Sequence, residues 1–168
     1  MTTRRALLAL PLLLAACAEP TAGAPSTAAS KAGTPETLDF TGTTLDGVAY
    51  DAAQLAGKPS ILWFWAPWCA TCAVEAQSVG DFHEEYADRL TFLGIAGLGT
   101  VGAMKEFVSD MQVGTVTHLD DTPGKIWNKF GITQQSTYVL LDSAGTIVKQ
   151  SYLDDLALTG ELKKLVLL

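Results

Sequence analysis

Two cysteines, Cys69 and Cys72, are separated by two residues in the run Trp68-Cys69-Ala70-Thr71-Cys72. This spacing brings two thiols within reach of each other, and the thiolate form is the nucleophile of thiol–disulfide exchange. We predict a two-step exchange in which the Cys69 thiolate attacks a substrate disulfide and Cys72 then resolves the mixed disulfide. The same steps in reverse would oxidise a substrate dithiol.

A CxxC pair also fits a structural disulfide or half of a zinc site. A disulfide across so short a loop constrains the unfolded chain little. A structural zinc site needs further thiolate or imidazole ligands, and His83 and His118 are the only histidines. A candidate of another class is a copper or other metal carrier that uses Cys69, Cys72 and His118. We expect neither a bound metal nor any other cofactor.

The elements around the pair place it at the end of a strand and the start of a helix. Residues 61–65 are five consecutive large apolar residues, which is typical of a strand buried on both faces at the centre of a partly parallel sheet. Residues 71–87 have the apolar spacing of an amphipathic helix. The helix dipole and the free N–H groups of its first turn should lower the pKa of Cys69 below the free value of about 8.5. Cys72 should face inwards.

The rest of the chain predicts an α/β fold, with a central mixed β-sheet flanked by helices and an N-terminal β-hairpin. The expected elements are a hairpin of residues 38–45 and 48–50, a helical turn from Asp51 to Gly57, a strand at 91–96, a helix at 101–111 capped by Thr100, a short helix opened by Thr122-Pro123 and closed by Gly131, an edge hairpin of 138–141 and 146–149, and a last helix capped by Thr159. His118 is expected at a sheet edge.

The composition is that of one ordinary globular domain. The chain has 168 residues, 48% of them hydrophobic and 17% charged, with a formal net charge of -7. Its 11 basic residues are scattered, which argues against nucleic acid as a partner. We expect a monomer.

The N-terminus has the features of an export signal. Arg4 and Arg5 precede an apolar stretch at residues 6–15 that is too short to span a membrane. Leu14-Ala15-Ala16-Cys17 resembles a bacterial lipobox, so we predict a signal peptide at 1–16 and lipid on Cys17; an ordinary cleavage site is the alternative. Residues 17–36 should form a lipidated tether and residues 37–168 the folded domain. We therefore expect an extracytoplasmic protein, lipid-anchored to the outer face of the cell membrane.

The sequence around the cysteines resembles a known family. Phe64-Trp65-Ala66-Pro67-Trp68-Cys69-Ala70-Thr71-Cys72, followed by Glu75, is similar to the active site of extracytoplasmic thioredoxin-like proteins of the TlpA, ResA and DsbE type. Phe92, Gly94-Ile95-Ala96, Val101-Gly102-Ala103-Met104 and Ile126-Trp127 resemble the actinobacterial DsbE and DsbF group, which includes a lipoprotein. The resemblance covers residues 37–168.

It implies a thioredoxin-like fold and a thiol:disulfide oxidoreductase that acts on exported proteins and is recycled by a membrane redox partner. Disulfide formation is the favoured direction. Reduction of apocytochrome c or of other extracytoplasmic thiols is the alternative.

The resemblance also implies roles for residues around the cysteines. Glu75 matches a partly buried acid that would accept a proton from Cys72, although any acid early in a helix is favoured by the dipole. Trp65, Pro67 and Trp68 surround the pair, and the two tryptophans could shield the sulfurs and contact unfolded substrates. Trp63, Phe64 and Trp127 are expected in the core.

One position departs from the family. Family members carry a cis-proline facing the CxxC, and here Gln135-Ser136 occupies that loop. A cis peptide before a residue other than proline costs roughly 3 kcal/mol, so we expect a trans bond. In the family this loop pairs with substrate as an added strand and its proline keeps metals off the thiols. Without that proline, the resemblance does not establish either property for this chain.

Overall fold

A computed structural model of the protein describes residues 33–167. The predicted signal peptide, the lipidation site Cys17 and the predicted tether up to residue 32 lie outside the described residues.

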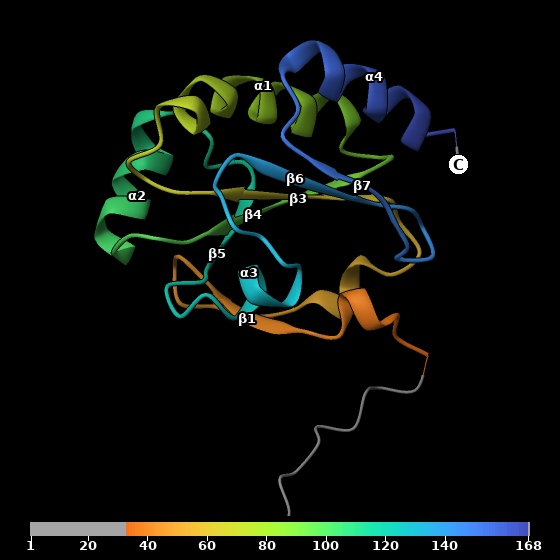
Figure 1. Ribbon diagram of the computed structural model, residues 1–168, viewed down its shortest axis with the longest axis horizontal. Helices are drawn as coiled ribbons and strands as arrows, with labels where there is room; N and C mark the ends of the chain where they lie inside the picture. The colour runs from red at the N-terminus through yellow and green to blue at the C-terminus, as the bar shows by residue number, and fades with distance from the viewer. Residues whose placement is uncertain (1–32, 168) are drawn as a thin grey trace, which may run out of the picture.

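Among residues 33–167, seven strands form one mixed sheet with the order β2-β1-β5-β4-β3-β6-β7 (Figure 1). The strands are β1 (Thr41–Thr44), β2 (Ala49–Asp51), β3 (Ser60–Trp65), β4 (Thr91–Ala96), β5 (Thr117–Asp120), β6 (Thr137–Leu141) and β7 (Ile147–Ser151). The parallel pairs are β3 with β4 and β4 with β5, and the neighbours β6 and β1 add antiparallel pairs. The predicted mixed sheet is confirmed.

Helices cover both faces of the sheet (Figure 1). They are α1 (Ala70–Tyr86), α2 (Val101–Asp110), α3 (Lys125–Lys129) and α4 (Asp155–Leu165), with 3-10 turns η1 (Glu36–Leu38) and η2 (Ala52–Leu55). The core on one face is built from α1, α2 and α4, and the core on the other from α3, η1 and η2. None of the helices between residues 33 and 167 has the length and apolarity needed to cross a membrane.

Strand β3 is the centre of this arrangement, and all its residues are buried. Because side chains alternate along a strand, Trp63 and Trp65 face the core under α1, while Leu62 and Phe64 face the core under α3. The run of large apolar residues thus serves both cores, as predicted for a strand covered on both faces. It fixes the position of the chain that follows, where the cysteines lie.

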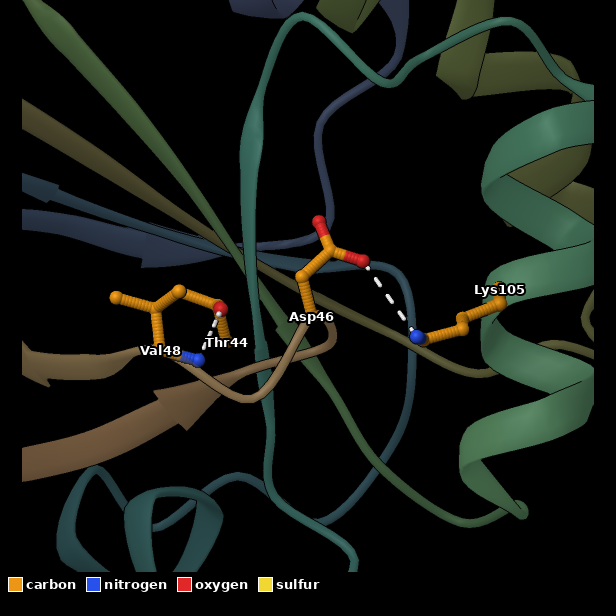
Figure 2. Close-up of polar contacts among 4 residues, drawn as sticks. All are labelled: Thr44, Asp46, Val48 and Lys105. Atoms are coloured by element: carbon orange, nitrogen blue, oxygen red, sulfur yellow. Dashed lines mark hydrogen bonds and ion pairs between the residues drawn. The ribbon is translucent and has the colours of Figure 1, made fainter.

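The N-terminal hairpin forms at the predicted Asp46-Gly47 turn, but its first strand is shorter than predicted. Leu38 lies in η1, and β1 begins only at Thr41. Figure 2 shows the hairpin tip, where Asp46 pairs with Lys105 of α2 at 3.5 Å and Val48 N–H donates to Thr44 Oγ1 at 3.1 Å. A cleft of about 910 Å³ lies between this hairpin and α2. The ion pair is solvent-exposed, so it contributes little to stability.

The predicted element order is wrong at residues 117–120, where it has no strand and the structure has β5. His118 was expected at a sheet edge, but β5 lies between β1 and β4, and His118 is buried opposite Gly94. The polar residues of Thr117-His118-Leu119-Asp120 hide the apolar alternation that identifies a strand. The segment is a strand because β1 and β4 pair with it on both sides.

Two predicted helix caps are also wrong. Helix α3 does not begin at Thr122, because the buried Asp121 carboxylate accepts the N–H groups of Ile126 and Trp127 at 2.9 and 2.8 Å. Helix α4 is capped by Asp154, and Thr159 lies inside it. In both cases a nearby aspartate, the stronger capping residue, takes the role predicted for threonine. The caps predicted at Asp51 and Thr100 are confirmed.

Candidate active site

The two cysteines lie at the N-terminus of α1, directly after β3. Cys69 is the N-cap residue, and its Sγ accepts the backbone N–H of Cys72 at 3.0 Å. The pair forms a disulfide with a Cα–Cα distance of 5.2 Å. When the disulfide opens, a Cys69 thiolate therefore meets the free N–H groups and the positive end of the helix dipole. The predicted location is confirmed.

The two sulfurs differ in access to solvent. Cys72 is fully buried, whereas Cys69 is 6% exposed and lines a groove of about 460 Å³. Trp68 stands beside it, 61% exposed, with its indole N–H donated to Leu98 O at 2.7 Å. Pro67 lines the same groove and packs closely against Gly99. An incoming sulfur can therefore approach Cys69 but not Cys72.

The side chain of Trp65 is fully buried, so it is not accessible for the predicted contact with unfolded substrates. Its ring stacks on Phe107 at a centroid distance of 4.5 Å, and its Nε1 donates to His118 Nδ1 at 3.1 Å. His118 Nε2 in turn donates to Val113 O at 3.0 Å. Burial lowers the pKa of His118 to about 4, so the ring is neutral and can accept the indole proton.

Both ring nitrogens of His118 are thus engaged inside the core, which removes the histidine from the ligand set considered for a metal carrier. Within residues 33–167, no group of three or more His, Cys, Asp or Glu side chains is placed to hold a metal ion. Among these residues, no further ligands are therefore placed beside the cysteine pair to complete a closed metal site.

Glu75 is buried one turn after Cys72 on the same face of α1. Its Oε2 accepts hydrogen bonds from Ser136 Oγ at 2.5 Å and from Trp63 Nε1 at 3.2 Å. Its Oε1 has no hydrogen-bond partner among the described residues. Burial raises the pKa of Glu75, and the bonds from Ser136 and Trp63 oppose that rise.

The loop before β6 contains Gln135, which is half-buried, and Ser136, which is buried. No peptide bond within residues 33–167 is cis, so the predicted trans bond between Gln135 and Ser136 is confirmed. Ser136 adopts a left-handed backbone conformation with φ of 64°, and its N–H donates to Phe64 O at 2.8 Å. The backbone at this position is therefore unlike that of a proline, whose φ is near -65°.

Trp63 lies in the core as predicted, but its polar contact with Glu75 was not predicted. The ring is fully buried, and its N–H is one of the two donors to Glu75 Oε2. A buried indole almost always finds an acceptor, and the signal available was an acidic residue predicted on the helix that packs over the strand.

Comparison with known proteins supports this assignment. Residues 35–150 match the AhpC/TSA family. The soluble secreted antigen MPT53 of Mycobacterium tuberculosis is 42% identical over 111 residues, which are 66% of this chain and 63% of that protein. The chain therefore matches less than two thirds of the length of this curated relative.

Two solved structures share the fold. The structure of MTB DsbF in its mixed oxidized and reduced forms has a TM-score of 0.74 and 42% identity, covering 79% of this chain and 98% of DsbF. A secreted M. tuberculosis disulfide oxidoreductase homologous to E. coli DsbE has a TM-score of 0.72 and 37% identity, covering 77% and 98% of the two chains. The predicted resemblance to the DsbE and DsbF group is confirmed, and the chain belongs to the AhpC/TSA family with a thioredoxin-like fold.

Proposed function

We propose that the protein is a thiol:disulfide oxidoreductase that exchanges disulfides with exported proteins through Cys69 and Cys72. The observation that carries this proposal is the asymmetry of the pair at the start of α1: Cys69 lines a groove, and Cys72 is buried beside Glu75. A structural disulfide would not require an open groove at one sulfur. The activity of the DsbE-homologous relative supports the same chemistry.

In the reducing direction, the Cys69 thiolate attacks one sulfur of a substrate disulfide, and the other substrate sulfur leaves as a thiolate. Cys72 then loses its proton and attacks Cys69 Sγ, so that the Cys69–Cys72 disulfide forms and the second substrate thiolate leaves. The substrate gains two electrons and the cysteine pair loses them. In the oxidising direction a substrate thiolate attacks Cys69 Sγ, and Cys72 leaves as a thiolate that takes up a proton. The second substrate thiolate then attacks the substrate sulfur of this mixed disulfide, so that the substrate disulfide forms, Cys69 leaves as a thiolate, and the cysteine pair has gained the two electrons that the substrate lost.

Glu75 is proposed to exchange that proton with Cys72. A thiol buried in apolar surroundings is a poor nucleophile until it is deprotonated. Glu75 is the acid on the same helix face, and its Oε1 is free of hydrogen bonds within the described chain. The same group can accept the proton in one direction and return it in the other.

Disulfide formation is the proposed direction, and the reduction potential of the Cys69/Cys72 couple tests it. Thioredoxin-like proteins range from about -270 mV for reductants to about -120 mV for oxidants. We expect equilibration in glutathione buffers to give a value nearer the oxidising end. A value near that of thioredoxin would assign the protein to reduction of apocytochrome c or of other extracytoplasmic thiols.

The roles of the two cysteines are tested by trapping. In Cys72→Ala, the mixed disulfide on Cys69 cannot be resolved, so substrate proteins should accumulate as adducts on a non-reducing gel. Cys69→Ala should trap far fewer, because Cys72 is fully buried. Equal trapping by both variants would contradict the assignment of Cys69 as the attacking residue.

An extracytoplasmic, membrane-anchored location is also proposed, with lipid on Cys17 and a membrane redox partner that recycles the pair. The lipobox-like sequence and the secreted relatives support it. Cys17→Ala should move the protein from the membrane fraction to the soluble fraction while the exchange rate stays unchanged. Membrane partitioning equal to that of the unaltered chain would contradict lipidation.

A further inference from the structure

Ser136 stands where the resembled family has proline, and both of its polar groups are used in the buried interior. Its N–H donates to Phe64 O at 2.8 Å, and its Oγ donates to Glu75 Oε2 at 2.5 Å. A proline could make neither bond. The left-handed φ of 64° costs a non-glycine residue free energy, so it persists only where the surroundings enforce it.

Glu75 depends on neutral donors for the stabilisation of its negative charge. Within residues 33–167, neither ion pair of the structure includes Glu75, which is 3% exposed. A buried carboxylate without a cation must be stabilised by hydrogen bonds. Of the two donors to its Oε2, the Ser136 hydroxyl at 2.5 Å is much closer than the Trp63 indole at 3.2 Å. Short bonds to an ionised acceptor are the stronger ones.

We propose that Ser136 is a positioning residue for Glu75: its hydroxyl engages Oε2 and leaves Oε1 free as the atom that exchanges a proton with Cys72. The inference rests on the proposed role of Glu75. The hydrogen bond between Ser136 and Glu75 joins the loop before β6 to α1, the helix that follows Cys69 and contains Cys72.

The direction of the effect follows from the groups around the carboxyl. Burial raises the pKa of Glu75. The hydrogen bonds from Ser136 and Trp63 and the nearby Tyr138 of β6 lower it, while the charge of Asp155 on α4 raises it. Loss of the Ser136 hydroxyl therefore raises the pKa of Glu75 further. Because only the ionised carboxylate can accept the Cys72 proton, the acidic limb of the resolution rate should move to higher pH.

The test compares Ser136→Gly with Ser136→Ala in single-turnover reduction of a peptide disulfide across pH. Both variants lose the hydroxyl and keep the backbone N–H that donates to Phe64 O. They differ because glycine adopts positive φ without strain, whereas alanine does not. We expect the midpoint of the acidic limb to rise by about one pH unit in both variants. A shift of this size corresponds to the free energy that a hydrogen bond to a charged group contributes. The Glu75 carboxyl, followed directly by ¹³C NMR, should show the same upward shift.

Glu75→Gln separates this inference from the proposed function. It should abolish the acidic limb, and Ser136→Gly added to it should change the pH profile no further. An acidic limb that survives Glu75→Gln would overturn the role of Glu75 itself. An unchanged midpoint in Ser136→Gly, with the limb abolished by Glu75→Gln, would overturn only the role of Ser136. A loss of melting temperature in Ser136→Ala alone, with no pH shift in either variant, would also overturn it.

Discussion

Replacing Ser136 by proline should destabilise the folded domain by about 3 kcal/mol or more, although the family resemblance implies proline at this position. The ring fixes φ near -65°, whereas Ser136 has a φ of 64°, so the loop cannot keep its path. The substitution also removes the N–H bonded to Phe64 O and the hydroxyl bonded to Glu75. Two buried acceptors then lose a donor, and each such loss costs about 1–3 kcal/mol.

Urea unfolding of the oxidised protein measures this effect, and Ser136→Gly is the matched control. Glycine loses the same hydroxyl but retains the N–H and relieves the strain of positive φ, so it should lower the free energy of unfolding by less than proline does. A proline variant as stable as the glycine variant would show that the loop does not hold the left-handed conformation.

Gly94→Ala should have an effect of similar size in the middle of the sheet. A Cβ at this position would lie 2.0 Å from His118 Nδ1 and 2.9 Å from Trp65 Nε1. The methyl group would therefore separate the indole from its acceptor and push apart two buried rings on β3 and β5, the strands on either side of β4. Overpacking of this kind costs about 1–3 kcal/mol, and the broken hydrogen bond adds about 1–3 kcal/mol.

Gly80→Ala provides the control for Gly94→Ala. Gly80 lies within α1, and a methyl group added there would meet nothing within 4 Å, so alanine should stabilise the protein by roughly 0.5–1 kcal/mol. Thermal unfolding of the two variants should thus move in opposite directions. The double variant Gly94→Ala/His118→Ala should lose less unfolding free energy than the two single variants lose together, because removing the imidazole ring also removes the clash. Strict additivity would argue against the contact.

The reactive centre could be predicted from sequence because its cause is local. The apolar run before Cys69 identifies a buried strand, and the residues after it have the period of a helix, so the pair had to lie at a helix N-terminus. Local chemistry also identified the Asp51 cap and the Asp46-Gly47 turn. In each case the residues that determine the structure are neighbours in the chain.

The features that were missed depend on contacts between distant segments. Ser136 and Glu75 are joined by a hydrogen bond between the loop before β6 and helix α1, which no local pattern reveals. Strand β5 is polar along much of its length and forms because two neighbours pair with it. His118 is buried because Trp65 and Val113 satisfy both of its ring nitrogens. Tertiary context overrides propensity at these positions.

The position of β3 in the sheet has a consequence for how the chain acquires its structure. Its six residues carry no charge and no proline, and such a segment with an open edge readily pairs with other chains. One edge is closed by β4, which follows α1, but the other is closed only by β6, after α2, β5 and α3. Closing a pair of strands so distant in the chain is slow. Aggregation during refolding should therefore compete with the docking of β6, and Ser136, just before that strand, reaches Glu75 in the same late event.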